Sequence, residues 1–254
     1  SPDFSMAEIA QRAVRALIPM ATDGVGPSYA GVRLLQGAQG AGYAVDLFVN
    51  RYRMPDAGLT LHVALPGPLG LLPYRWVCAP ASRRLEARYA ASIRDDQIAY
   101  LWPSASLALH AALHARGIPI VLEGINTRMA HAKRLLDQAY DAFGAPPAHG
   151  ITEARIAEEE AKLALATAIF APSRAVAGAL AGSPLQDRTI PASYGADTRR
   201  PIARPPRDPD RPLTFVFCGY ASVRKGAHHL LEAWRSMPQG MRLRIVGRIE
   251  PVIA

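Results

Sequence analysis

One turn of the chain combines glycine with two adjacent basic residues. Residues 219–226 read GYASVRKG, with Gly219 first and Arg224 and Lys225 near the end. The turn follows an apolar segment typical of a buried strand and precedes a helical pattern, which is where open α/β sheets bind ligands. Two cations at a helix start are unfavourable beside the partial positive charge of the helix dipole. A bound diphosphate would relieve this conflict, so we favour a phosphate site over a solvent-exposed basic turn.

A second glycine turn lies near the front of the chain, where residues 24–28 read GVGPS. It follows the first predicted strand and opens the first predicted helix. Glycine lets the backbone approach a ligand closely, and a helix N-terminus offers amide groups to an anion. The G-x-G-x-x-G spacing of dinucleotide-binding loops is absent. Two interpretations therefore stay open: a ligand-binding loop with Gly24, Gly26 and Ser28 as its candidates, and an ordinary strand-to-helix turn.

Other polar residues favour structural roles. His110 and His114 lie four residues apart and share a helix face, as two metal ligands can. No third ligand is evident nearby and the glutamate of a zinc-protease helix is missing, so a partly buried helix face is the better interpretation. Ser173 precedes a helical pattern and is predicted to cap it. His228 and His229 adjoin the basic turn and either contact a ligand or cover the helix surface.

Composition narrows the class of protein. The chain has 254 residues, a formal net charge of +8 and 50% hydrophobic residues, so it can bury a sizeable core. A basic surface suits nucleotide phosphates, nucleic acid or an anionic membrane; without the aromatic and basic repeat of single-strand binders, we do not expect nucleic acid. The two cysteines, Cys78 and Cys218, have no metal spacing and fit a reducing cytoplasm. No apolar run reaches the length of a membrane span.

The elements that must position these turns alternate along the chain. Short apolar runs typical of buried parallel strands alternate with longer helical patterns. The predicted strands are 14–18, 44–49, 59–64, 98–102, 118–122, 168–171 and 213–218. The predicted helices are 28–39, 82–93, 104–115, 127–143 and 153–165. This alternation predicts an α/β protein with a Rossmann-like parallel sheet and helices on both faces.

A proline-rich break divides the chain. Residues 199–212 read RRPIARPPRDPDRP and predict a linker, since proline fixes φ and lacks an amide donor. After it come a strand at 213–218, a helix at 225–235 and a strand at 242–246. So small a unit buries too little apolar surface to be stable alone. We therefore expect a truncated second domain, which either packs on a second copy in a homodimer or is held by a fragment of the same protein absent from this sequence, unless its strands join the first sheet. Residues 1–5, before Met6, look like a cloning remnant.

Several segments together resemble family 4 of the glycosyltransferases, which are retaining enzymes with two facing Rossmann-like domains (the GT-B fold). LTFVFCGYASVRKGAHHLLEAW (213–234) and MRLRIVG (241–247) resemble the start of that family's donor domain. ATAIFAPSRAVAGAL (166–180) and TIPASYGADTRRP (189–201) are similar to its segments before that domain, and the front glycine turn resembles its glycine loop. The resemblance divides the chain into an acceptor-side domain at 6–198, a linker at 199–212 and the beginning of a nucleotide-sugar-binding domain at 213–254.

The resemblance implies transfer of a sugar from a nucleoside diphosphate sugar to a glycan, lipid or small-molecule acceptor, with retention at the anomeric carbon. Arg224 and Lys225 would hold the donor diphosphate and Gly219 would allow its close approach. No cofactor or metal is expected, because the two cations can replace a divalent ion. A cytoplasmic enzyme, in some cases in peripheral contact with the inner face of the membrane, fits this family.

The chain departs from the family pattern at three places. Tyr220 stands where many members have arginine, and residues 124–126 read GIN where many have a histidine near the reacting sugar. Glu123 and Asn126 are the candidates for contacting the sugar instead. The family's glutamate pair, spaced E-x7-E, would follow Ala254, so we expect little activity from this chain alone. Two alternatives stay open: a nucleotide-sugar epimerase or phosphorylase with paired domains, and a non-catalytic binding or scaffolding module.

Overall fold

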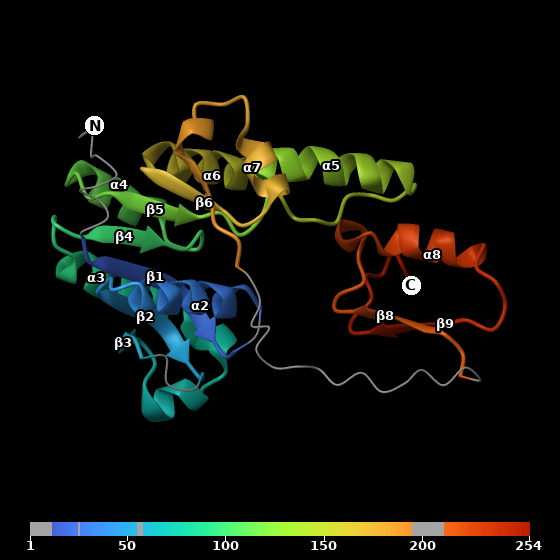
Figure 1. Ribbon diagram of the computed structural model, residues 1–254, viewed down its shortest axis with the longest axis horizontal. Coiled ribbons are helices and arrows are strands. Elements are labelled where there is room, and N and C mark those ends of the chain that lie inside the picture. Colours follow the sequence, from blue (N-terminus) through green and yellow to red (C-terminus); the bar gives the residue numbers. More distant parts are fainter. Residues whose placement is uncertain (1–11, 25, 55–57, 195–210) are drawn as a thin grey trace. The chain divides into compact units, whose positions relative to one another are not determined.

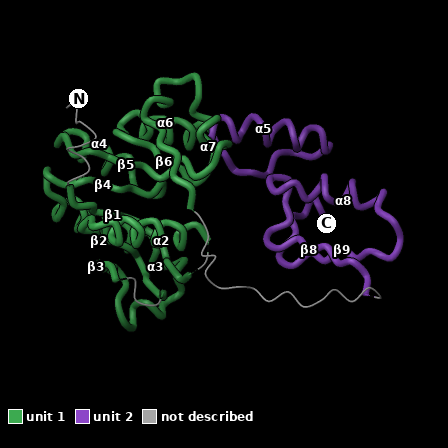
Figure 2. The backbone as a smooth tube through the Cα atoms, viewed as in Figure 1, with its two compact units in different colours: residues 1–128, 153–195 green, residues 129–152, 196–254 purple. Residues whose placement is uncertain are grey.

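The computed structural model describes residues 12–24, 26–54, 58–194 and 211–254, which form two compact units (Figures 1 and 2). Unit 1 takes residues 1–128 and 153–195, and unit 2 takes residues 129–152 and 196–254. The proposed cloning remnant at 1–5 and residues 199–210 of the predicted linker lie outside the described residues. No described helix is both long enough and apolar enough to cross a bilayer.

Unit 1 contains a seven-stranded sheet in which every neighbouring pair is parallel. Its strands are β1 (Val14–Thr22), β2 (Val45–Tyr52), β3 (Thr60–Val63), β4 (Ile98–Leu101), β5 (Ile120–Glu123), β6 (Ala168–Ala171) and β7 (Thr189–Pro191). The spatial order is β3-β2-β1-β4-β5-β6-β7. From β1 the strands are added toward one edge of the sheet as far as β3, and from β4 they are added toward the other edge as far as β7. The boundary between β1 and β4 is therefore the topological switch point, where Rossmann-like sheets bind ligands.

Helices cover both faces of this sheet (Figure 1). They are α2 (Gly26–Gly40), α3 (Tyr74–Ser92), α4 (Leu107–Ala115), α6 (Glu153–Leu165) and α7 (Arg174–Leu180), with short 3-10 turns η1 (Gly67–Leu71) and η2 (Gln186–Arg188). One core cluster packs α3, α4, α6 and α7 against strand residues such as Leu17 and Leu101. The alternate residues Ala16 and Ile18 belong to a second cluster with α2. Burial on both faces explains why the strands are continuous apolar runs.

Unit 2 contains a separate two-stranded parallel sheet, β8 (Thr214–Cys218) and β9 (Arg242–Val246). The 3-10 turn η3 (Val223–Lys225) and helix α8 (Ala227–Arg235) connect them, and α5 (Met129–Ala142) belongs to the same unit. Leu136 and Tyr140 of α5 share a core cluster with Ala221, Val223 and Ile253. The alternative expectation, that β8 and β9 join the first sheet, is therefore wrong.

The predicted fold class is confirmed: the protein is α/β with a parallel, Rossmann-like sheet between helices. Two local predictions need correction. The helix predicted at 225–235 begins at Ala227, because Gly226 adopts the left-handed conformation (φ 71°) and separates it from η3. The helix predicted at 82–93 begins two turns earlier, at Tyr74, and contains Pro80.

Candidate functional site

The basic turn of unit 2 begins at a close approach of two glycines. Gly219 follows β8 with φ 117°, and Gly247 follows β9 with φ 135°, both disfavoured for other residues. A Cβ atom added to Gly247 would lie 2.2 Å from the carbonyl oxygen of Gly219. Glycine is therefore needed after each of the two strands, at Gly219 and at Gly247. As a result, no side chain of the same residue covers the backbone of Gly219.

Lys225 reaches back over this backbone. A Cβ atom added to Gly219 would lie 2.9 Å from the Lys225 Nζ. The 3-10 turn η3 produces this fold-back: the amide of Lys225 donates to the Ser222 carbonyl (3.0 Å) and that of Gly226 to the Val223 carbonyl (2.9 Å). The structure thus brings together Gly219 and Lys225, two residues that the sequence assigned to one phosphate site.

The side chains of Arg224 and Lys225 are both exposed, and neither side chain forms a hydrogen bond or ion pair within the described part of the chain. Two unneutralised cations on adjacent residues repel each other and attract an anion. Arginine supplies a planar fork of donors that suits phosphate, and lysine supplies a mobile point charge. The pair can therefore bind a phosphate or diphosphate that approaches the carboxyl end of β8.

A buried carboxylate holds the turn in place. Glu250, 6% exposed, accepts a hydrogen bond from the Val223 amide (2.8 Å) and one from the Tyr140 hydroxyl (2.6 Å). Burial, together with Glu250, raises the pKa of Tyr140 to about 12, so the phenol keeps its proton. Glu250 thus links α5 to the first residue of η3 and fixes the backbone that carries Arg224 and Lys225.

His228 and His229 form the first turn of α8, next to the basic turn as the sequence placed them. Their ring centroids lie 3.9 Å apart, and Phe143 lies 5.6 Å from His228. The His228 Nδ1 atom is buried without a hydrogen-bond partner among the described residues. Burial, with a smaller contribution from His229, lowers the pKa of His228, so its ring is neutral at pH 7 and adds no charge to the turn.

In unit 1, the front glycine turn lies at the switch point of the sheet. Gly24 (φ 85°) and Gly26 (φ 70°) adopt the left-handed conformation between β1 and α2. The space where a Cβ of Gly26 would lie is open, whereas the hydroxyl of Ser28 is buried and donates to the Ala21 carbonyl (3.4 Å). The backbone of Gly26 is thus available to a ligand, while Ser28 ties the turn to β1.

Glu123, at the carboxyl end of β5, is fully buried. Its two carboxylate oxygens accept hydrogen bonds from the hydroxyl groups of Tyr100 (2.6 Å) and Tyr194 (2.7 Å). Burial raises the pKa of Glu123, and the two phenols oppose this effect. A sugar could reach this carboxylate only if one of the tyrosines moved. Asn126, three residues on, is exposed and open to a ligand.

The other polar candidates have structural roles, as predicted. His110 is fully buried and its Nδ1 lies 2.8 Å from the Ser106 carbonyl oxygen. Burial lowers the pKa of His110. Ser173 caps α7, with its hydroxyl oxygen accepting from the Val176 amide (3.3 Å).

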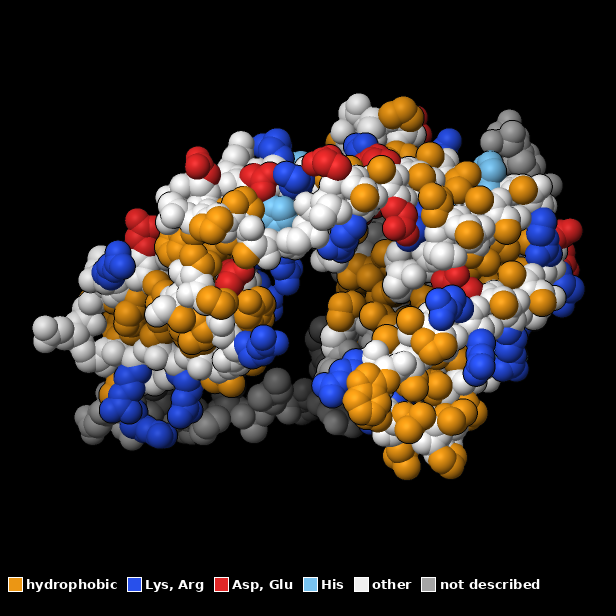
Figure 3. Space-filling model, turned by 180° about the vertical axis from the view of Figure 1, so that it is seen from behind, with side chains coloured by type: hydrophobic (Ala, Val, Ile, Leu, Met, Phe, Trp, Pro, Cys, Tyr) orange, Lys and Arg blue, Asp and Glu red, His pale blue; other side chains and the backbone are white. Residues whose placement is uncertain are grey.

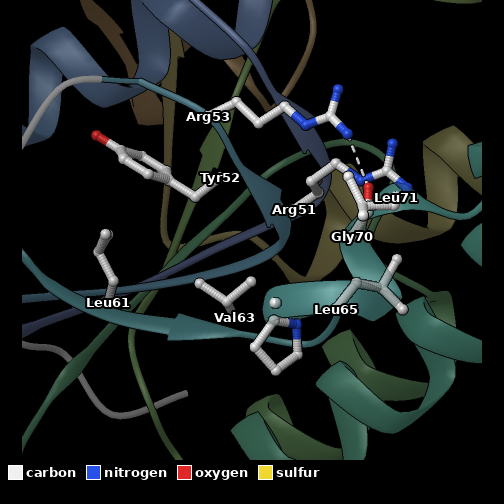
Figure 4. Close-up of a pocket in the computed structure, with 10 residues that line it drawn as sticks. Arg51, Tyr52, Arg53, Leu61, Val63, Leu65, Gly70 and Leu71 are labelled. Carbon is white, nitrogen blue, oxygen red and sulfur yellow. Dashed lines mark hydrogen bonds between the residues drawn. The ribbon is translucent and has the colours of Figure 1, made fainter.

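Sequence reasoning missed a pocket of about 420 Å³ beside β2, β3 and η1 (Figure 4). Arg51 and Arg53 line it from β2 and the residues after it, and Leu61, Val63 and Leu71 line it from β3 and η1. The guanidinium groups donate to the carbonyls of Leu72 (2.8 Å) and Gly70 (2.8 Å). The available signal was the polar run N-R-Y-R at the end of an otherwise apolar strand.

Sequence reasoning also missed the partners of the two buried glutamates. Tyr100 lies within an apolar strand, and a buried tyrosine generally needs a hydrogen-bond partner, which was a usable signal. Glu250 follows β9 in the segment RIEP. Nothing in the local pattern distinguishes it from a solvated residue.

No protein-family model matches the chain, and no curated protein matches it.

Proposed function

We propose that the protein takes part in the transfer of a sugar from a nucleoside diphosphate sugar to an acceptor, with retention of the anomeric configuration. In this proposal the turn between β8 and α8 holds the donor diphosphate. The observation that carries the proposal is the fold-back of Lys225 over the bare backbone of Gly219, with Arg224 beside it and both side chains exposed.

Charge explains why such a turn would help the reaction. Negative charge develops on the diphosphate as the bond to the sugar breaks. Cations fixed at that point stabilise the transition state more than the ground state. Glu250 and Tyr140 fix the backbone of the turn, so little reorganisation is needed when charge develops. In this proposal the two cations supply the positive charge that a divalent ion otherwise supplies, so no metal is required.

In this proposal, unit 1 binds the acceptor that receives the sugar. The support is the open backbone of Gly26 at the switch point of its sheet, and the exposed Asn126 three residues after β5. Sugar hydroxyls suit backbone amides and an asparagine side chain, since both donate and accept hydrogen bonds.

A turnover assay tests the proposal. The protein is incubated with a panel of nucleoside diphosphate sugars and simple acceptors, while release of nucleoside diphosphate is measured and proton NMR gives the anomeric configuration of the product. Release with retention supports the proposal, and inversion contradicts it. Conversion of one nucleotide sugar into another favours an epimerase, and a failure to bind any of the nucleotides contradicts the proposal.

A further inference from the structure

A cluster of large apolar side chains is exposed on one part of unit 1. Leu69, Leu71 and Leu72 in and after η1 are 50%, 81% and 44% exposed, and Trp76 in the first turn of α3 is 67% exposed. Figure 3 shows hydrophobic side chains gathered at the lower tip of unit 1, where these elements lie. Leucine and tryptophan at such exposures on consecutive elements mark an interaction surface.

The segment that carries this apolar tip, residues 57–85, has only basic charged residues. Residues 57–85 contain no aspartate or glutamate, and Arg75, Arg83 and Arg84 within them are exposed. The guanidinium carbon of Arg75 lies 5.3 Å from the centre of the Trp76 ring. A tryptophan between leucines and arginines is typical of segments that lie at the boundary between lipid headgroups and acyl chains.

The pocket behind the tip adds a second, independent observation. Leu71 belongs both to the exposed cluster and to the lining of the 420 Å³ pocket, so the two are continuous. Arg51 lines the same pocket and is only 8% exposed, yet its Nε has no hydrogen-bond partner among the described residues. A buried guanidinium with a free donor is costly unless an acceptor completes it. A phosphate oxygen is the acceptor that fits best.

We infer that η1 and the first turn of α3 form a docking surface for a bilayer that contains anionic phospholipid. Leu69, Leu71, Leu72 and Trp76 enter the boundary between headgroups and acyl chains, and Arg51 and Arg53 receive a headgroup phosphate. A second copy of the chain is the less suitable occupant, because a two-fold contact would place the same arginines against each other. This inference does not depend on the proposed sugar transfer.

Sedimentation with vesicles tests the docking surface. The full chain is mixed with vesicles of phosphatidylcholine alone, and with vesicles in which about a third of the lipid is phosphatidylglycerol. We expect binding to the anionic vesicles to be at least about tenfold tighter, since several arginines face the lipid. Leu71→Asp should weaken that binding by roughly tenfold or more, because it removes an inserted side chain and adds a negative charge. The control is Leu135→Asp on α5, at a leucine that is 45% exposed in unit 2.

Tryptophan fluorescence shows whether the tip itself enters the lipid. Trp76 is exposed, whereas Trp102 is only 1% exposed and Trp234 of unit 2 is half-buried beside Phe215. Lipids brominated on the acyl chains should quench the emission of the wild type and not that of Trp76→Phe. Arg51→Gln and Arg53→Gln should each reduce binding to anionic vesicles while leaving the weak binding to neutral ones unchanged.

Three results would overturn the inference. One is equal binding to anionic and neutral vesicles, or no binding to either. Another is an equal loss in Leu71→Asp and Leu135→Asp, with both variants folded by circular dichroism. The third is a dimer, seen by light scattering without lipid, that Leu71→Asp dissociates, which would assign the surface to a second copy of the chain.

Discussion

The carboxyl group of Glu123 is fully buried, and its hydrogen-bond partners among the described residues are two phenols rather than a cation. The strand position of Glu123 was predictable from the sequence, since it ends an apolar run. Its partners were not, because they come from residues 23 positions before it and 71 positions after it. Such a contact depends on the order of strands in the sheet, which local patterns do not contain.

The buried Glu123 predicts a pH dependence of stability. Burial raises its folded-state pKa above the ordinary value of 4.5. The folded state therefore holds a proton that the unfolded state releases, and the resulting stability is fully present below pH 4.5 and is lost as pH rises through the raised pKa. We expect the free energy of unfolding of the wild type, relative to Glu123→Gln, to fall across this window. Urea unfolding at several pH values measures it, and a difference that is independent of pH would contradict the account.

At the scale of the elements, glycines determine how closely α2 approaches the sheet. A Cβ atom added to Gly31 would lie 2.6 Å from the Trp102 ring and 3.1 Å from the Ile18 side chain, whereas one added to Gly37 would meet nothing within 4 Å. Both glycines are inside α2, so they form a matched pair.

We expect Gly31→Ala to destabilise unit 1 by about 1–3 kcal/mol, because Trp102 and Ile18 must shift in a packed core. Gly37→Ala should be neutral or stabilise the protein by up to about 1 kcal/mol, since alanine favours the helix and meets no neighbour. Urea unfolding of the two variants, followed by far-ultraviolet circular dichroism, checks both signs. If Gly31→Ala were as stable as Gly37→Ala, the close packing of α2 on β1 and β4 would be wrong.

Most strands were predictable because burial on both faces leaves short, continuous apolar runs. The prediction failed where that reason does not hold. β7 (Thr189–Pro191) is a three-residue strand with partly exposed residues, and it carries no such run. The first two turns of α3 place Trp76 and Arg75 in solvent and include Pro80, so they lack the periodicity of a buried helix face.

For the molecule as a whole, the division into units differs from the predicted one. The sequence assigned residues 129–152 to the front domain, yet α5 packs with η3 and β8 in unit 2. The periodicity of α5 shows that one face is buried, but not which unit covers it. Glu250 and Tyr140, which join α5 to the basic turn, lie 110 residues apart and could not be paired from the sequence.

The apolar residues of β8, β9 and α8 divide into two groups. Phe217, Leu231 and Ile245 pack into the core that α5 completes. Phe215 is 40% exposed and lies 5.6 Å from Trp234. The homodimer through this segment stays a prediction.

The central claim is that the basic turn binds the diphosphate of a nucleotide, and calorimetric titration with uridine, guanosine and adenosine diphosphates tests it most directly. Lys225→Ala should weaken binding of the preferred nucleotide by about 1.5–3 kcal/mol, the range for a hydrogen bond to a charged group. The control is Arg235→Ala, which removes the same charge from an exposed residue at the other end of α8. The account predicts a loss in Lys225→Ala and wild-type affinity in Arg235→Ala. Equal affinity of Lys225→Ala and the wild type would contradict it.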